Sequence, residues 1–508
     1  MGRRNREMNR FPFLVILSFS IFIVGPSAFA QLPPVDIKAS GFIDMVSFWY
    51  SNIAPGTPGQ GIYSFTTPPL RPDASPSELS GAWNHSSAYI ESRARLKLQA
   101  MTGKALSGTL FFEMDSFRWG EIGTGPNEMG RWGADSAAVE VKNVYFDVAL
   151  PYLGIPLPMM LRLGIQPLYV RPYIFTYTDG AGITAAIKID PITIMPMWFK
   201  PLEGKVYASD DVDVYGLNLS AQIDQLTLGG FGFYYNMNTY PLSNVTLTYG
   251  ENPTYQSDMW WFGLYAEGKV GPIDLNFDVV YDYGEVRKEF GSPAPDVDYS
   301  GWATRLTVNY PWDNFNIGAT VMYASGADQK KTSDSGLPGT GTPYGTTTTK
   351  VGSYVTPPGS EQWAGGESLI AYGSWVCRSD IGFFVWPFTA ATNLTRGGWG
   401  GTWFAKLFAG YKVTPWYKAS LEILYIGDTT QNGNTLGDAR SNGKPRDDRT
   451  IGWEFDLIHT FNIYQNLKFE VGMGYLVAGD ALDQSWPYEE NASFKNPWIL
   501  ATHLTFEF

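Results

Sequence analysis

Residues 500–508 close the chain with the sequence LATHLTFEF, in which apolar and polar side chains alternate. Successive side chains of a β-strand point to opposite faces of the sheet, so this alternation predicts a strand with one apolar and one polar face. The same pattern recurs in residues 275–279 (LNFDV) and 467–471 (LKFEV). We therefore predict a β-rich chain whose strands separate an apolar surrounding from an aqueous one.

Around these strands the chain repeats one unit, which consists of a strand of about ten residues, a tiny turn, a second strand and a long polar loop. This repeat is typical of an all-β transmembrane antiparallel barrel with short periplasmic turns and long extracellular loops. Eight short turns and nine long connections predict about 18 strands. A count of 16 stays open, because the two strands expected within 183–199 are short and apolar on both faces.

The long connections set the predicted boundaries of the strands. They are expected at 51–84, 119–135, 168–181, 200–211, 238–257, 285–298, 326–401, 429–449 and 480–496. Tryptophan and tyrosine residues fall near the predicted strand ends, where amphipathic rings sit at the level of the lipid headgroups. The expected girdle residues are Trp49, Tyr50, Trp198, Trp260, Trp302, Tyr310, Trp416, Tyr417, Trp453 and Trp498.

The connection of residues 327–401 is long enough to have a role of its own. Its first half, 335–359, is rich in Gly, Thr and Pro, whereas 369–392 includes Trp375, Phe383 and Trp386. An exposed apolar segment is expected to find a partner surface. We expect this segment to fold into the barrel and narrow the channel. Two alternatives to this folding remain: the segment forms a contact within a trimer, or it forms an extra hairpin that raises the count to 20 strands.

The composition excludes several protein classes. Charged residues make up 17% of the 508, against about 25% in an ordinary soluble domain. Mean hydropathy is −0.15, and beyond the N-terminus no apolar window is long enough for a membrane-spanning helix. The only cysteine is Cys377 and there are three histidines, so neither a cofactor nor a metal site is predicted. The net charge of −13 argues against binding to nucleic acid.

The N-terminus has the form of an export signal. Residues 1–30 carry four arginines, then an apolar stretch from Phe11 to Val24, and end on Ala28-Phe29-Ala30, an A-x-A cleavage pattern. The apolar stretch is too short to span a bilayer as a helix. We therefore predict a cleaved signal peptide at 1–30 and a barrel at 31–508, in the outer membrane of a Gram-negative bacterium.

The polar parity of each strand predicts which side chains face the lumen. The basic candidates are Arg93, Arg95, Lys97, Arg162, Lys188 and Arg305. The acidic candidates are Glu113, Asp115, Asp274, Asp278, Asp282, Glu422, Glu454, Asp456 and Glu470. Basic groups concentrate early in the barrel and acidic groups late, although Lys406 interrupts the acidic set. Two readings stay open: opposed arcs that produce a transverse field across the pore, or pairs that neutralise one another.

Two segments resemble known porins. Residues 141–148 with 161–166, and residues 474–482, are similar to segments of the alginate-export-like and phosphate-selective-type porin families. These families often carry a second basic residue where Ile165 stands, so the resemblance implies a porin and no particular solute. The ending on Phe508 resembles the C-terminal signal by which outer-membrane proteins are recognised for barrel insertion.

The pattern and the resemblance together predict a water-filled channel for passive diffusion of small hydrophilic solutes and ions. The alternatives are a substrate-selective channel for an anionic or sugar solute, and a sheath or plugged conduit around a partner such as a multiheme cytochrome. No GxSxG motif or comparable catalytic pattern accompanies His85, so an enzyme is not predicted. The expected surroundings are outer-membrane lipid and lipopolysaccharide and the barrel-assembly machinery, and the resemblance implies a homotrimer.

Overall fold

The computed structural model of the chain describes most of the predicted barrel. The described residues are 34–52, 86–120, 130, 132, 138–150, 154, 158–203, 211–240, 255–288, 296–335, 337–341, 343–360, 366–373, 399–486 and 489–508. The predicted signal peptide at 1–30 and the part of the long connection at 374–398 lie outside the described residues.

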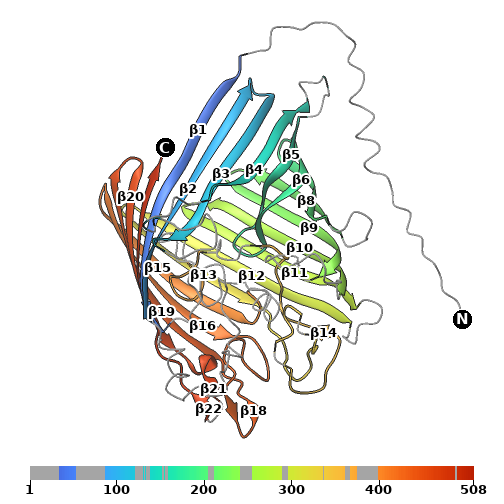
Figure 1. Cartoon of the computed structure of the whole chain (residues 1–508), viewed down its shortest axis with the longest axis vertical. Coiled ribbons are helices and arrows are strands. Elements are labelled where there is room, and N and C mark those ends of the chain that lie inside the picture. Colours follow the sequence, from blue (N-terminus) through green and yellow to red (C-terminus); the bar gives the residue numbers. More distant parts are fainter. Residues whose placement is uncertain are drawn as a thin grey trace, which may run out of the picture.

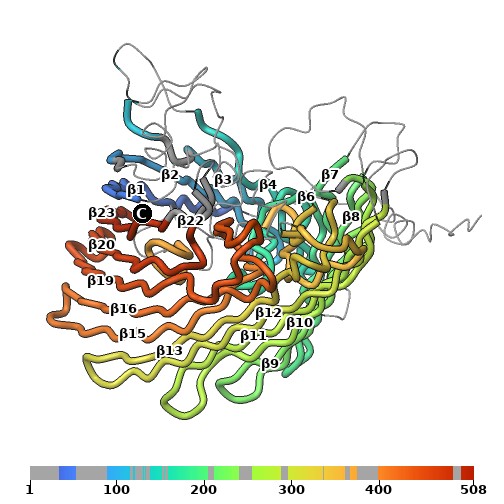
Figure 2. The backbone as a smooth tube through the Cα atoms, turned by 90° about the horizontal axis from the view of Figure 1, so that it is seen from below, coloured from blue at the N-terminus to red at the C-terminus, as the bar shows by residue number. Residues whose placement is uncertain are grey.

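Eighteen antiparallel strands close into one barrel (Figures 1 and 2). They are β1 (Asp36–Ser51), β2 (Ser86–Thr102), β3 (Leu106–Arg118), β4 (Glu140–Ala149), β5 (Met159–Val170), β6 (Thr176–Ile189), β7 (Ile192–Leu202), β8 (Val212–Ile223), β9 (Leu226–Tyr240), β10 (Tyr255–Val270), β11 (Ile273–Lys288), β12 (Val297–Trp312), β13 (Phe315–Ala324), β15 (Thr402–Thr414), β16 (Tyr417–Asp428), β19 (Thr450–Tyr464), β20 (Leu467–Ala478) and β23 (Trp498–Glu507). Pairing of β1 with β23, from Phe42 opposite Glu507 to Ser51 opposite Trp498, closes the ring. The predicted all-β barrel and its 18 strands are confirmed.

Both alternative strand counts are wrong. Strands β6 and β7 are complete members of the barrel, with 14 and 11 residues. Strand β13 pairs directly with β15, with Ile317 opposite Ala409, so the connection between them inserts no hairpin into the wall. The described part of that connection contributes the two-residue strand β14 (Lys350–Val351), which runs parallel to the start of β12.

One predicted long connection is short. Strand β5 continues to Val170 and β6 begins at Thr176, whereas a loop was expected over 168–181. The chain reverses direction within residues 171–175, where Arg171 has a φ of 47° and its carbonyl accepts the N–H groups of Ile174 and Phe175. We call residues 171–175 the inward turn, because its side chains lie inside the barrel.

The two ends of the barrel differ in the length of their connections. At one end β8 and β9 are joined by Asp224 and Gln225, and β10 and β11 by Gly271 and Pro272. Asp224 and Gly271 have φ values of 55° and 60°, which tight two-residue hairpins favour. Strand β1 begins and β23 finishes at this short-turn end, which is the periplasmic end in barrels of this kind.

In the described part of the opposite, long-loop end there are two small hairpins and one helical turn. Strand β17 (Arg440–Ser441) pairs with β18 (Lys444–Pro445), and β21 (Gln484–Trp486) pairs with β22 (Glu489–Ala492). The 3-10 turn η4 spans Asp480–Leu482. None of the helices in the described part of the chain is long and apolar enough to cross a membrane.

The outer wall of the barrel is apolar. On β10 the outward side chains of Trp260, Phe262 and Leu264 are 39%, 47% and 63% exposed, whereas the intervening Met259 and Trp261 are buried inside. Exposed apolar side chains at every second position match a lipid surrounding, in which the backbone is satisfied by the closed ladder of strands.

Aromatic side chains gather on the outer wall towards both ends. Trp302 stacks on Tyr323 towards the long-loop end, with 4.8 Å between ring centroids, and Phe315 stacks on Tyr411 at the short-turn end at 4.4 Å. Tyr50 does not belong to this girdle, contrary to the prediction, because it is buried inside the barrel. It follows Trp49 directly in a strand, so the two rings must face opposite sides.

The core of the molecule lies inside the barrel, at the long-loop half. Along β11 the inward side chains are polar at first, with Asp274 and Asp278, and then include the buried Val280 and Val286. The expectation that inward positions are polar therefore holds for the short-turn half, whereas the long-loop half mixes apolar inward positions with buried carboxylates such as Asp282 and Glu454. Chain segments folded into the lumen cover the inner face of the wall in this half, which explains why apolar side chains are buried there.

Candidate functional site

The connection between β13 and β15 folds back into the barrel. Its described residues, 326–335, 337–341, 343–360 and 366–373, are here called the inserted loop. Much of this loop lies within the ring of strands (Figure 2, gold), whereas residues 345–347, 349 and 350 are exposed. Leu337, Val355, Leu369 and Tyr372 are all at most 2% exposed and belong to the same apolar core as the inner wall. Their burial indicates that the loop fills lumenal space.

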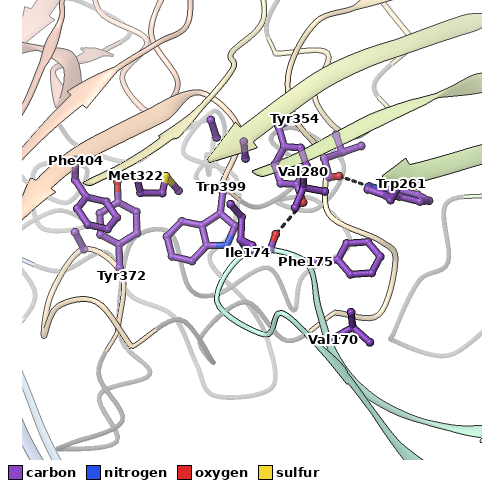
Figure 3. Close-up of a cluster of buried hydrophobic side chains, with 14 of the residues drawn as sticks. Val170, Ile174, Phe175, Trp261, Val280, Met322, Tyr354, Tyr372, Trp399 and Phe404 are labelled. Atoms are coloured by element: carbon purple, nitrogen blue, oxygen red, sulfur yellow. Dashed lines mark hydrogen bonds between the residues drawn. The ribbon is translucent and has the colours of Figure 1, made fainter. Parts of the chain in front are cut away.

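The middle of the inserted loop is held by Asp282 of β11. The two carboxylate oxygens accept the backbone N–H groups of Gly301 on β12 and Val355 on the loop, each at 2.8 Å. The carbonyl of Val355 in turn accepts the indole N–H of Trp261 at 2.8 Å (Figure 3). A lumenal carboxylate thus joins two strands to the loop, and its burial at 0% exposure is compensated by these donors.

The inward turn meets the inserted loop inside the barrel. The hydroxyl of Tyr354 donates to the carbonyl of Ile174 at 2.8 Å (Figure 3). Ser360 donates from its hydroxyl to the carbonyl of Phe175 at 3.2 Å. The ring of Phe175 stacks on Phe231 of β9 at 4.5 Å between centroids. The two segments therefore form one unit that packs against strands β9 and β10.

The second anchor of the inserted loop is on β19. Glu454 accepts the N–H of Ile370 at 2.6 Å, the N–H of Ala371 at 3.0 Å and the hydroxyl of Ser368 at 3.0 Å. Asp456 accepts the N–H of Leu369 at 3.1 Å. Successive backbone N–H groups directed at carboxylates form an anion-binding concavity, and here the anions are side chains of the wall.

An ion-pair cluster adjoins this anchor. Glu367 of the loop forms two ion pairs: one carboxylate oxygen lies 2.7 Å from Nε of Arg305, and the other lies 3.0 Å from Nζ of Lys406. Lys406 also contacts Glu422 of β16 at 3.3 Å. Burial by itself raises the pKa of Glu367, but Arg305 and Lys406 outweigh it and hold the pKa below its ordinary value. Glu367 is therefore ionised at neutral pH.

A further ion-pair cluster centres on Arg171 of the inward turn. Its guanidinium pairs with Glu267 and Asp278, and it also donates to the side-chain oxygen of Asn276 at 2.8 Å. The same group lies over the ring of Tyr265 at 4.6 Å. Arg171 thus connects the turn after β5 to strands β10 and β11.

The early basic residues converge on one carboxylate. Glu113 of β3 pairs with Arg93, at 3.6 Å, and with Arg95 on the neighbouring strand β2. Lys142 of β4 reaches the other oxygen of Glu113 at 3.1 Å and also contacts Asp179 at 3.0 Å. Arg93, Arg95 and Lys142, here called the basic arc, thus surround one buried carboxylate.

The remaining predicted lumenal residues are placed as follows. Arg162 pairs with Asp147 at 2.8 Å, and Asp274 with Lys269 at 3.0 Å. Glu470 lies 3.3 Å from Nδ1 of the buried His503. Lys97 is half-buried and Lys188 exposed, while the side chain of Asp115 lies outside what the structure describes.

The lumenal charges are therefore interleaved, since most of the predicted basic and acidic residues meet a partner of opposite sign. This arrangement matches the reading of neutralising pairs better than two opposed arcs. Sequence reasoning missed Arg171, Glu367 and Asp179, because each of these has a partner on a strand that is distant in sequence. Local alternation carries no signal for such partners.

The C-terminal Phe508 completes the seam of the barrel. Its backbone N–H and carbonyl bond to the carbonyl and N–H of Gly41, at 3.0 and 2.8 Å. A recognition role for Phe508 stays a prediction. Among the side chains that the structure describes, no group of three or more His, Cys, Asp and Glu is arranged to hold a metal ion.

Comparison with known proteins found solved structures of similar fold. No family model and no curated protein matches the chain, so the resemblance to the alginate-export-like and phosphate-selective-type families is not shown. Three solved structures from Pseudomonas aeruginosa are similar in fold. OccK11 (OpdR) is 11% identical, with 93% of this chain and 96% of that chain covered and a TM-score of 0.46. OccK2 (OpdF) is 9% identical, with 92% and 97% of the two chains covered and a TM-score of 0.49, and the outer membrane protein OpdK is 9% identical, with 93% and 98% covered and a TM-score of 0.47. The likeness concerns the fold alone. The chain folds into a closed antiparallel β-barrel with a wall of 18 strands.

Proposed function

We propose that this barrel is a substrate-selective channel for small hydrophilic solutes, with its long-loop half narrowed by the inserted loop and the inward turn. The observation that carries the proposal is the division of the lumen. The short-turn half has polar and charged inner walls, whereas the long-loop half is packed with the chain's own apolar and backbone groups. An open diffusion pore needs no such filling, so the filling favours selection over free passage.

The basic arc around Glu113 favours anionic solutes, including acidic sugars. Arg93, Arg95 and Lys142 surround this single carboxylate, and Lys97 lies on the same inward face of β2. Cationic side chains in a water-filled passage raise the local concentration of anions. We propose that solutes pass along this arc.

The test is single-channel conductance of the refolded protein in a planar bilayer, with a KCl gradient across it. We expect a small, steady conductance and a reversal potential on the anion-selective side. A cation-selective reversal potential contradicts the proposed solute class. A correctly folded but silent barrel contradicts the channel itself.

A plugged barrel that conducts nothing is the second candidate, and the tight packing of the inserted loop is the observation that favours it. A sheath around a multiheme cytochrome is less favoured, because the chain's own segments occupy the space that such a partner needs. Heme absorbance in the purified material tests that alternative. The homotrimer, lipopolysaccharide binding and the barrel-assembly machinery as a partner stay predictions.

A further inference from the structure

We propose that Arg305 and Lys406 form a carboxylate-binding site that the chain's own Glu367 occupies in this structure. The consequence for gating rests on the channel function proposed above, whereas carboxylate binding by the pair does not. The site's ligand class is a small carboxylate, because the group that fills it is one.

The first argument is the geometry of the pair. Each oxygen of Glu367 faces one cation, with Nε of Arg305 at 2.7 Å and Nζ of Lys406 at 3.0 Å. The side chain of Glu367 is 2% exposed, and those of both cations are 8% exposed. Charge-assisted hydrogen bonds to both oxygens of a carboxylate, away from water, are the features of a specific carboxylate receptor.

The second argument is where the three groups come from. Arg305 is on β12 and Lys406 on β15, both in the wall, whereas Glu367 is on the inserted loop. The receptor therefore belongs to the barrel and persists when the loop moves. Its occupant belongs to a connection between two strands and not to the wall, so docking of the loop and binding of an external carboxylate are alternatives.

The third argument is unused hydrogen-bonding capacity. Nη1 of Arg305 is buried and has no hydrogen-bond partner among the described residues. The guanidinium lies over the ring of Tyr173 at 4.3 Å, which fixes its plane. A buried donor without an acceptor is costly, and a carboxylate not tethered to the loop has the freedom to satisfy it.

Other carboxylates near the pair do not replace Glu367. Glu422 contacts Lys406 at 3.3 Å, and Asp278 lies opposite Arg305 in the strand register while pairing with Arg171. Among the described ion pairs, Glu367 alone joins both cations. In the proposed channel, an anionic solute that reaches the pair competes with Glu367 and favours release of the loop.

Chemical rescue tests the site directly. Replacing Glu367 by alanine removes a CH2–COO⁻ group, which corresponds to acetate. The readout is hydrogen–deuterium exchange of the backbone amides of 368–371, measured on the full-length folded barrel in detergent. We expect Glu367→Ala to speed this exchange on the order of tenfold. Sodium acetate should slow it again in a saturable way, whereas the neutral isostere acetamide should not.

Three variants serve as controls. Glu367→Ala combined with Arg305→Met should lose the rescue by acetate. Asp274→Ala, which removes a lumenal carboxylate paired with Lys269 away from the site, should leave exchange at 368–371 unchanged with or without acetate. Glu367→Gln keeps the shape of the side chain and serves if the alanine variant does not fold. It should speed exchange, and acetate should not slow it because the amide fills the space.

The proposal is overturned if acetate and acetamide act alike on Glu367→Ala, if the rescue survives loss of Arg305, or if Glu367→Gln exchanges like the wild type. Because exchange is measured without ion flow, these outcomes are separate from the conductance test. A silent barrel with rescue by acetate contradicts the channel and supports the site. A conducting barrel without rescue by acetate supports the channel and contradicts the site.

Discussion

The backbone N–H of Ile370 donates to Oε1 of Glu454 across 2.6 Å, so the inserted loop is hydrogen-bonded to the wall strand β19. Ala371 and the hydroxyl of Ser368 donate to the other oxygen of the same carboxylate. Fully buried carboxylates are costly unless donors surround them. Glu454 thus anchors the loop, because both of its carboxylate oxygens accept hydrogen bonds from loop residues.

Replacement of Glu454 by leucine should release the end of the inserted loop. The change removes both acceptor oxygens and leaves the N–H groups of Ile370 and Ala371 unpaired, at about 1–3 kcal/mol for each orphaned group. We expect faster hydrogen exchange at 368–371 and a larger single-channel conductance. Glu454→Gln, which keeps one acceptor, should have a smaller effect. Equal behaviour of Glu454→Leu and wild type would show that this anchor does not hold the loop.

Asp282 should control the middle of the loop in the same way. Asp282→Ala removes the acceptor for Val355 on the loop and for Gly301 on β12. Hydrogen exchange at 353–355 should rise, while the barrel strands remain protected. The matched control is Asp298→Ala, since Asp298 accepts the hydroxyl of Thr349 at 3.0 Å on the exposed side of the same connection. If both variants change 353–355 equally, the lumenal carboxylate has no special role.

Acid should loosen the loop through Glu367. Burial opposes its ionisation, but Arg305 and Lys406 lower the pKa below the ordinary 4.5. A carboxyl group whose pKa is lowered on folding contributes stability above its unfolded pKa, and this contribution is lost as the pH falls through the lowered value. The part of the conductance and of the exchange at 368–371 that depends on Glu367 should therefore rise as the pH falls below about 4.5.

The comparison with Glu367→Gln isolates this effect. Glu422 contacts Lys406, and Asp278 lies opposite Arg305 in the strand register, so these two carboxylates also adjoin the cations. The glutamine variant keeps their contribution and removes that of Glu367. The comparison covers about pH 3 to 6, which brackets the ordinary pKa of a carboxyl group. If conductance and exchange at 368–371 depend on pH in the same way in the wild type and in Glu367→Gln, the prediction is wrong.

The basic arc should set ion preference. Glu113→Gln leaves Arg93, Arg95 and Lys142 without their shared carboxylate, so the reversal potential in a KCl gradient should shift further towards anions. Arg95→Gln should shift it the other way. Lys104→Gln, in the exposed turn between β2 and β3, is the control and should leave the potential unchanged. Shifts of the same sign in Glu113→Gln and Arg95→Gln would contradict a role for this arc.

The wall of the barrel was predictable because its signal is local. Alternation in segments such as 467–471 follows from the geometry of a strand, and short turns such as Asp224-Gln225 mark hairpins without reference to distant residues. The 18 strands follow from these two signals. The inward parity of Glu454, Asp456 and Arg305 was predictable for the same reason.

The contents of the lumen were not predictable, because they depend on partners distant in sequence. Glu367 is 62 residues from Arg305, and Arg171 is 107 residues from Asp278. The inward-facing Phe231 and Phe233 break the apolar–polar alternation of β9, and only the segment that covers them explains their burial. Apolar residues at successive inward positions of a strand are a local sign that the lumen is covered, and the sequence of β9 contains this sign.

The most direct measurement is the single-channel conductance of the refolded wild type beside a variant lacking residues 366–395. The deletion removes Glu367 and the amides that bind Glu454 and Asp456, while the direct pairing of β13 with β15 keeps the wall closed. We predict a severalfold larger conductance for the deletion variant, at unchanged strand content by circular dichroism. Equal conductance of the two folded barrels would contradict the claim that the inserted loop narrows the channel.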